Sequence, residues 1–350
     1  MYVSIEPEDD STDIVISEYY NFARYGDVLV CNGRKFQFTD VNVPDVVKFG
    51  EYEKVIGGSC VTIDDNDNSQ NRNPAMFGGL YPFTTSFDGF RGGDVITTLV
   101  GPLFYSFSKW RVQPMVEAEL QYTSGTRPDP PTLPAGDIKL VFANLYNYWV
   151  TYGTDRDLRG ADSEEEFIRQ SAKTSLALSM LDADIIAVCE LENLDGNLAA
   201  IDLRDKVNAK FPSGSRVYEA ATIAAGIDKV GGDVIKTEVF YDTTKFNYLA
   251  ASVLTDAEVD GEILNKTSTG LIFGGGAVEG GLSRSPIAVS LQTIASGGQI
   301  TVVSSHYKSK GVYSGDPPGL DGDKNDGAGG WNWVRTLTTE AIAKWLKGYP

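Results

Sequence analysis

The chain has 350 residues, of which 42% are hydrophobic and 22% charged, and these proportions exclude a largely disordered protein. Its 30 Lys and Arg against 48 Asp and Glu give a formal net charge of −18, which argues against a passive nucleic-acid binder because phosphate contacts need basic side chains. An enzyme that meets phosphates at one local metal site is compatible with that charge. The apolar runs are far too short to span a bilayer, so no membrane partner is expected.

The length predicts two domains, and the first part of the chain has the pattern of short strands separated by turns. No amphipathic helix is evident in residues 1–115, so a small barrel or sandwich is expected there. The turns are predicted at Asn32-Gly33, Gly57-Gly58 and Gly92-Gly93. The strands are predicted at Tyr2–Ile5, Asp13–Tyr19, Val28–Cys31, Lys35–Thr39, Cys60–Ile63, Val95–Val100, Leu103–Phe107 and Trp110–Val112.

The three cysteines fit no zinc pattern, since no CxxC pair occurs and the chain has one histidine. Cys189 lies in an apolar run and is expected in the core. Cys31 and Cys60 would pair if the protein is exported, which their positions alone leave open. No signal peptide follows Met1, so either the protein is cytoplasmic or its true N-terminus is missing.

Residues 116–137 are expected to form a linker, because 123–136 are rich in Pro, Gly, Ser and Thr. From 138 to 350 strands and helices alternate, which predicts an α/β or α+β sandwich. Strands are expected at Ile138–Asn144, Asp184–Glu190 and Val234–Tyr241, with a hairpin of Ser285–Ile294 and Ile300–His306 and helices around 198–211 and at Asn332–Leu346.

A further helix is predicted to begin at Ser163, because Glu166 three residues later completes a capping box. Ile168, Ala172, Leu176 and Met180 recur at a spacing of four residues along it. That spacing predicts that these four side chains form its buried face.

Polar residues end three of the apolar strands, namely Asn144, Glu190 and His306. Functional sites in α/β proteins are commonly built at such strand ends. Two plainer interpretations remain open at this point: a solvated terminal carboxylate for Glu190, and a structural histidine for His306.

His306 is followed by Lys308 and Lys310, which predicts a local positive pocket in an acidic chain. Neighbouring cations should lower the pKa of the imidazole, so a neutral His306 is expected unless an anion is close. A substrate phosphate would be such an anion.

Two acidic stretches are candidates for calcium loops. In the stretch from Asp321 the sixth position is Asp326 and the twelfth is Asn332, where an EF-hand requires Gly and Glu. A looser calcium site at 321–326 stays open, whereas Asp64–Asn68 is expected to be a solvated turn.

An ordered series of motifs resembles the secreted bacterial nucleases of the ExeM/NucH type, which belong to the endonuclease/exonuclease/phosphatase superfamily with the fold of deoxyribonuclease I. The N-terminal part shares the resemblance through Tyr-Asn-Phe-Ala-Arg-Tyr-Gly (20–26) and Arg-Gly-Gly-Asp-Val (91–95). The other motifs are Asn-Leu-Tyr-Asn-Tyr (144–148), Arg-Gly-Ala-Asp-Ser (159–163), Cys-Glu-Leu-Glu-Asn (189–193), Gly-Asp-Val-Ile-Lys (232–236), His-Tyr-Lys-Ser-Lys-Gly (306–311) and Trp-Asn-Trp-Val-Arg (331–335).

The resemblance implies metal-dependent hydrolysis of phosphodiester bonds in DNA or RNA by an extracellular enzyme, with no stable protein partner. Glu190 and Asn144 would hold Mg²⁺ or Mn²⁺, with Ca²⁺ as a further candidate, and His306 would flank the phosphate. Asp233 would orient the site as a fourth catalytic residue. The substrate-binding residues would be Arg284, Lys308, Lys310, Asn332 and Arg335, the last two by holding the loop after His306.

The implied fold is α+β: a β-rich, OB-like module over 1–115, then an incomplete DNase I-like sandwich over 138–350. The family pattern also has a second histidine and a Gly-Asp-x-Asn strand end, both expected after the last helix, and this chain has only His306. We therefore expect a fragment cut at both ends, with little or no activity. Two alternatives stay open: a phosphatase or phosphodiesterase of the same superfamily, and a non-catalytic surface protein that keeps the fold.

Overall fold

The computed structural model describes residues 1–7, 12–70, 76–77, 81–82, 91–123, 136–153, 159–267, 269–274, 282–311 and 319–348. The chain forms two compact units. Unit 1 comprises Met1–Leu133 with Lys324–Ala328, and unit 2 comprises Pro134–Asp323 with Gly329–Pro350. Over the described ranges, none of the helices has the length and apolar character needed to cross a membrane.

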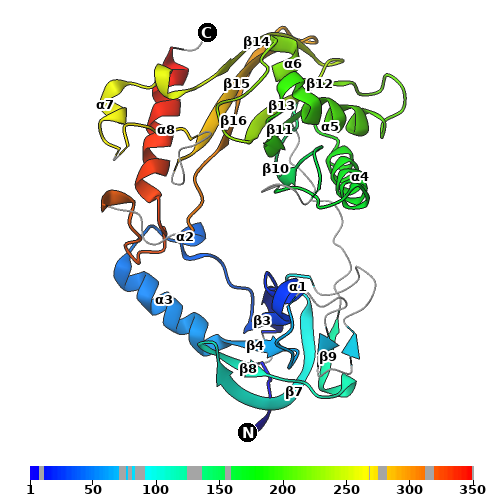
Figure 1. Cartoon of the computed structure of the whole chain (residues 1–350), viewed down its shortest axis with the longest axis vertical. Helices are drawn as coiled ribbons and strands as arrows, with labels where there is room; N and C mark the ends of the chain where they lie inside the picture. Colours follow the sequence, from blue (N-terminus) through cyan, green and yellow to red (C-terminus); the bar gives the residue numbers. More distant parts are fainter. Residues whose placement is uncertain are drawn as a thin grey trace. The chain divides into compact units, whose positions relative to one another are not determined.

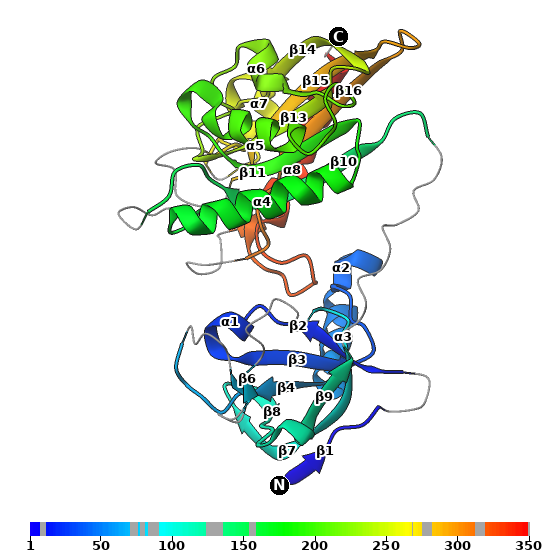
Figure 2. The same ribbon diagram turned by 90° about the vertical axis from the view of Figure 1, so that its right-hand side faces the viewer.

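Unit 1 is built on strands whose pairing closes a ring (Figure 2). β2 pairs with β3, β3 with β4, β7 with β8 and β7 with β2, all antiparallel, while β4 and β8 are parallel. Apolar side chains such as Ile16, Val30 and Ile63 fill its core. The strands are β1 (Tyr2–Ser4), β2 (Ile14–Glu18), β3 (Asp27–Asn32), β4 (Cys60–Asp64), β7 (Val95–Ser106), β8 (Lys109–Val112) and β9 (Leu120–Thr123), with a separate pair β5 (Met76–Phe77) and β6 (Tyr81–Pro82).

A helix that the sequence did not predict, α3 (Val46–Ser59), lies between β3 and β4 in the chain. Asp45 caps it, because its carboxylate accepts hydrogen bonds of 3.0 Å from the backbone N–H groups of Val47 and Lys48. None of its side chains is buried, so it has no apolar stripe to reveal it. The turn predicted at Gly57-Gly58 is wrong, since both glycines lie inside this helix.

Three further expectations for unit 1 need correction. The strand predicted at Lys35–Thr39 is wrong, because α2 (Phe38–Val41) begins there after extended residues. Val95–Val100 and Leu103–Phe107 form one strand, β7, rather than two. The unit also continues past residue 115 through η1 (Glu117–Glu119) and β9, which pairs with β7, so the expected linker 116–137 begins inside it. Residues 124–135 of that linker lie outside the described ranges.

Cys31 and Cys60 form a disulfide in unit 1. The two residues lie directly opposite each other on β3 and β4. The bond therefore joins the two strands on either side of α3.

Unit 2 is a mixed α/β fold built on two sheets. The first has the order β10 (Leu140–Tyr148), β11 (Ile185–Glu192), β13 (Ile235–Asp242) and β12 (Tyr218–Ala220). The second has the order β14 (Phe246–Val253), β15 (Arg284–Thr293) and β16 (Gln299–His306). One hydrophobic cluster, with members such as Ala187, Val239 and Val289, joins β11 and β13 to β15 and β16. β11 is buried along nearly its whole length, as its continuous apolar sequence predicts.

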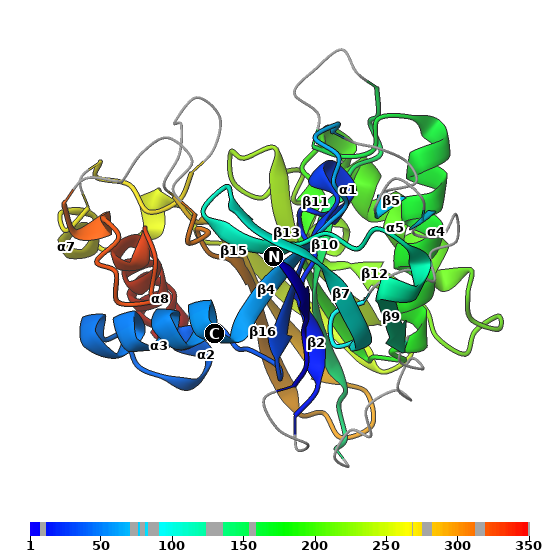
Figure 3. The ribbon, with the colours of Figure 1, turned by 90° about the horizontal axis from the view of Figure 1, so that it is seen from below.

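Helices flank the two sheets, as Figures 1 and 3 show. α4 (Glu164–Met180) and α5 (Leu198–Asn208) pack on the first sheet through a cluster that includes Phe167, Ile186 and Leu203. α7 (Gly261–Leu264) and α8 (Asn332–Lys347) pack together at the other side of the unit. The short helices are α1 (Phe22–Tyr25) in unit 1 and α6 (Ala221–Ala225), η2 (Asp195–Asn197), η3 (Asp256–Glu258) and η4 (Gly319–Asp321) in unit 2.

The buried face predicted for α4 is wrong by one residue. Ile168, Leu176 and Met180 are 56%, 50% and 59% exposed, and Ala172 is exposed as well. The buried face instead consists of Phe167, Ser171, Ser175 and Leu178. Each serine hydroxyl donates to a carbonyl of its own helix, so these small polar side chains are satisfied while packed against the sheet.

Candidate active site

Asn144 in β10, Glu190 in β11 and His306 at the end of β16 come together, although β10 and β11 continue past the ends that the sequence predicted, to Tyr148 and Glu192. Asn144 Nδ2 donates to Glu190 Oε1 at 2.8 Å, and His306 Nε2 lies 3.5 Å from the same oxygen. The Glu190 side chain is 18% exposed, so the carboxylate is accessible but held. The three residues form a single polar cluster at one edge of the two sheets.

The backbone at Glu190 is irregular, and this irregularity sets the direction of the carboxylate. Glu190 has φ +62°, and the β11–β13 register shifts between Val188 and Leu191, which is a β-bulge. On β10, Tyr146 and Asn147 also have positive φ, and the backbone N–H of Asn147 donates to Glu190 Oε2 at 3.1 Å. Positive φ at non-glycine residues is costly and is concentrated at functional sites.

Arg284 and Asp233 lie beside this cluster. Arg284 pairs with His306 across β15 and β16, and its Nε donates to Asp233 Oδ2 at 3.2 Å. The Asp233 loop is fixed by Asn193, whose Nδ2 donates to the Asp233 carbonyl at 2.8 Å. Gly231 in that loop has φ +67°, and a Cβ there would lie 2.6 Å from the Ser285 hydroxyl, so only glycine fits.

The surroundings of His306 favour a neutral imidazole. Burial lowers the pKa of His306, and the positive charge of Arg284 lowers it further, whereas Glu190 and Asp233 raise it. Within the described residues, its Nδ1 is buried and has no hydrogen-bond partner. A neutral imidazole can accept a proton or bind one donor, as general acid–base chemistry requires.

Lys308 adds uncompensated positive charge near His306. Burial lowers the pKa of Lys308, followed by repulsion from Arg284, Arg159 and Arg335. Its ammonium lies 5.5 Å from the ring centroid of Trp331. Because the arginines repel the Lys308 ammonium, an anion such as a phosphate would be stabilised in this part of the site.

The other predicted binding residues, Arg335, Asn332 and Lys310, have different surroundings from Arg284 and Lys308. Nη1 of Arg335 donates to the carbonyls of Lys308, Ser309 and Gly330 at 3.3, 3.4 and 2.8 Å, so it holds the loop after His306. Asn332 Oδ1 accepts from Arg335 Nη2 at 3.3 Å. Lys310 is exposed.

The acidic stretches do not form a calcium loop. Asp321 is buried, and its Oδ1 accepts from the backbone N–H of Val334 at 2.9 Å, which is a structural role. Asp64 and Asp65 accept from backbone N–H groups two residues on, as in a turn, but the expectation that this turn is solvated is wrong, because Asp65 is buried and Asp64 pairs with Arg111. No group of three His, Cys, Asp or Glu side chains suited to a metal occurs in the part of the chain that the structure describes.

The donor set at Glu190 nevertheless fits a magnesium-type ion. Mg²⁺ keeps several waters and binds through one or two carboxylates, so a single accessible glutamate is enough protein ligand. Asn144 turns its nitrogen to Glu190 while its Oδ1 accepts from the Tyr146 N–H at 2.8 Å. Glu190 is therefore the residue that could hold the ion, and Asn144 orients it.

Sequence reasoning missed three contributors to the site. Asn147 supports Glu190 through its backbone, Asn193 fixes the Asp233 loop, and Arg159 acts on His306 and Lys308 through its charge. Asn147, Asn193 and Arg159 all stand in motifs quoted above, which was the available signal. The contribution of Asn147 depends on the left-handed backbone and leaves no trace in side-chain type.

Neither a protein-family model nor a curated protein matches the sequence. Among solved structures, the chain is similar to an endonuclease/exonuclease/phosphatase from Bacteroides vulgatus, with 14% identity over 61% of this chain and 62% of that chain and a TM-score of 0.34. A humanized D. rerio TDP2 matches with 9% identity over 61% and 57% of the two chains and a TM-score of 0.32. An endonuclease/exonuclease/phosphatase family protein from Bacteroides thetaiotaomicron matches with 14% identity over 61% and 58% and a TM-score of 0.31.

The chain thus spans about three fifths of the length of these structures. Because TM-scores of this size do not establish a common fold, we infer function from the side chains of the site.

Proposed function

We propose that unit 2 carries the active site of a metal-dependent phosphodiester hydrolase that acts on DNA or RNA, of the endonuclease/exonuclease/phosphatase type. The observation that carries the proposal is the Glu190 carboxylate, held by Asn144 and Asn147 with His306 3.5 Å away. Beside it lie Arg284 and the Lys308 ammonium, which have the charge to bind phosphate oxygens.

Each residue has a role that its surroundings support. Glu190 would hold Mg²⁺ or Mn²⁺, which when bound neutralises charge that develops on the phosphate. His306, neutral because of its burial and Arg284, would accept or donate a proton at the reacting oxygen. Arg284 would bind a phosphoryl oxygen, and Asp233 would keep its guanidinium in place.

We expect the turnover of this chain to be slow. The resemblance implies two histidines at the phosphate, and His306 is the only histidine in the sequence. Catalytic residues that act as a unit lose most of their effect when one is missing.

Features of unit 1 support the narrower proposal of an exported ExeM/NucH-type enzyme. Disulfides such as Cys31–Cys60 persist mainly in oxidising environments outside the cytosol. The ring β2–β3–β4–β8–β7 is a small five-stranded barrel, which supports an OB-like module.

The test combines metal binding with cleavage, using the intact chain in excess over fluorogenic DNA and RNA. We expect Mn²⁺ binding by electron paramagnetic resonance, and slow cleavage that EDTA abolishes. Cleavage that persists in EDTA would overturn the metal-dependent mechanism. Mn²⁺ binding without cleavage of either polymer would favour a phosphatase if bis(p-nitrophenyl) phosphate is hydrolysed, and a non-catalytic protein if it is not.

A further inference from the structure

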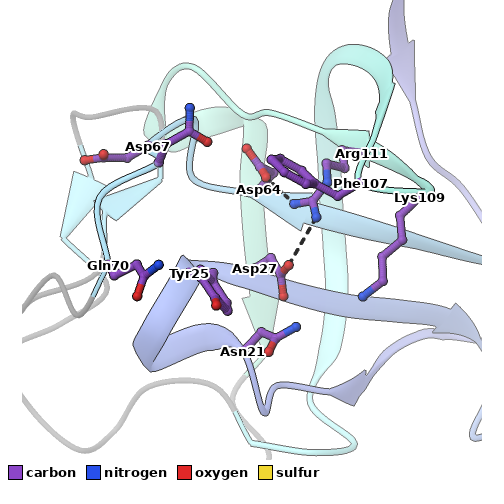
Figure 4. Close-up of a pocket in the computed structure, with 10 residues that line it drawn as sticks. Asn21, Tyr25, Asp27, Asp64, Asp67, Gln70, Phe107, Lys109 and Arg111 are labelled. Atoms are coloured by element: carbon purple, nitrogen blue, oxygen red, sulfur yellow. Dashed lines mark hydrogen bonds and ion pairs between the residues drawn. The ribbon is translucent and has the colours of Figure 1, made fainter. Parts of the chain in front are cut away.

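A pocket of about 530 Å³ opens on unit 1, remote in sequence from the residues of the proposed active site (Figure 4). Phe107, Lys109 and Arg111 enter it from the β7–β8 hairpin, and Asn21 and Tyr25 enter it from the segment between β2 and β3. Its size suits a ligand of one to two sugar or base rings.

The pocket contains an ion-pair network in which Arg111 pairs with two carboxylates. Arg111, only 6% exposed, pairs with Asp64 and, through Nη2, with Asp27 Oδ2 at 3.3 Å. Two carboxylates therefore share one guanidinium, which leaves this part of the pocket net negative and able to accept hydrogen bonds.

The walls offer aromatic rings. Phe107 is 77% exposed at the tip of the hairpin, with φ +48°, and the Arg111 guanidinium lies 5.2 Å from its ring centroid. Tyr25 is partly exposed on the facing side, with the Arg24 guanidinium 5.0 Å from its ring centroid. The exposed faces of these aromatic rings are surfaces on which a ligand ring can stack.

Small barrels of this type bind oligonucleotides or oligosaccharides through their loops. The charge of the pocket distinguishes between these two ligand classes. Single-stranded nucleic acid requires a positively charged groove. Here Lys109 and Arg111 face Asp27, Asp64 and Asp67, and residues 1–133 as a whole contain 10 Lys and Arg against 19 Asp and Glu. This balance disfavours a phosphate backbone and favours a neutral ligand rich in hydroxyl donors.

We propose that this pocket binds a neutral oligosaccharide. The apolar faces of its sugar rings would stack on Phe107 and Tyr25, and its hydroxyls would donate to Asp27 and to the side-chain amide oxygen of Asn21. Asn21 suits this role because its side chain makes no cap hydrogen bond to α1.

The test is isothermal titration of the intact chain with maltotriose, cellotriose and chitotriose, and with the single strand dT12 as the competing class. We expect at least one trisaccharide to bind with a Kd below about 1 mM. Phe107→Ala should weaken binding at least tenfold, Asn21→Ala should weaken it severalfold, and Phe107→Trp should keep it. Tyr105→Ala is the matched control, because Tyr105 is 60% exposed on the same hairpin, packs against Trp110 and does not line the pocket.

Three outcomes would overturn the proposal. One is that none of the three sugars binds. Another is that dT12 binds, loses affinity in Phe107→Ala and is not displaced by sugar. The third is that Tyr105→Ala and Phe107→Ala weaken sugar binding equally, since that would place the site elsewhere on the hairpin.

Discussion

Arg284 and His306 lie directly opposite each other on the antiparallel strands β15 and β16, and Asp233 holds the Arg284 guanidinium. The pairing sets a positive charge beside the imidazole, while Glu190 lies 3.5 Å from its Nε2. The charge state of His306 therefore depends on a balance between Arg284 and Arg159 on one side and Glu190 and Asp233 on the other.

The pKa of His306 should lie below its usual value of about 6.5. Because the chain has one histidine, NMR gives a single titrating ring signal. Arg284→Met should raise this pKa, and Arg284→Lys, which keeps the charge, should leave it low. The folded state then binds fewer protons than the unfolded state between the two pKa values, so the free energy of unfolding should rise with pH across that window. A pKa unchanged in Arg284→Met would contradict the electrostatic assignment.

Glu190→Gln should reduce cleavage by about 10²–10³-fold and remove Mn²⁺ binding, because it takes away the charge that holds the ion. The variant keeps the shape of the side chain, so the fold should be intact by circular dichroism. Glu164→Gln, on the exposed first turn of α4, is the control and should keep both properties. Less than a threefold loss of cleavage in Glu190→Gln would remove Glu190 from the mechanism.

Asn193→Ala should lower the free energy of unfolding by about 1–3 kcal/mol in urea, because the carbonyls of Val230 and Asp233 lose their donor. Asn265→Ala, at an exposed position after α7, should change it little. If the two variants are equally stable, the Asp233 loop is not held by Asn193.

Lys308→Met should weaken binding of a single-stranded oligonucleotide and reduce the slope of log K against log salt by about 1. The reason is that Lys308 is partly buried and repelled by Arg284, Arg159 and Arg335, so a bound phosphate would be a favourable partner for its ammonium. Lys54→Met, on exposed α3, should leave both quantities unchanged. An unaltered salt slope in Lys308→Met would show that its ammonium makes no phosphate contact.

Replacing Cys31 and Cys60 together by Ser should destabilise unit 1 by about 3 kcal/mol, because the disulfide closes a loop with a sequence separation of 29 residues. Dithiothreitol should have a similar effect on the intact chain and none on the double variant. Equal stability of the oxidised chain and the double variant would show that the bond contributes nothing.

Strands of unit 2 with continuous apolar runs were predictable, since such runs leave few alternatives, whereas β12 and β14 were not predicted. Helix faces were less predictable. In α4 the apolar side chains of Ile168, Leu176 and Met180 face solvent, while Ser171 and Ser175 pack inward together with other residues of the buried face. α3 was missed because its stability depends on a cap and local contacts rather than on a buried stripe.

The expectation that Asn144, Glu190 and His306 lie together agrees with the structure, although β10 and β11 do not end at Asn144 and Glu190 but continue beyond them. The contacts that support these three side chains were harder to predict from the sequence. Asn147 acts through a backbone N–H that only a left-handed turn directs at Glu190, and Arg335 acts on loop carbonyls rather than at the phosphate-binding side. Such roles depend on the path of the backbone in the folded chain more than on residue type.

The left-handed backbone at Glu190 sets the stability of this protein against the function proposed for its carboxylate. A non-glycine residue in that conformation costs about 1 kcal/mol or more, so Glu190→Gly would relieve strain where Glu190 now stands at φ +62°. That relief is offset by the hydrogen bonds that the carboxylate accepts from Asn144 and Asn147, so selection for heat tolerance alone would do little to keep the carboxylate. Directed evolution of this chain needs an activity screen at every round, or its winners will be robust proteins with an empty site.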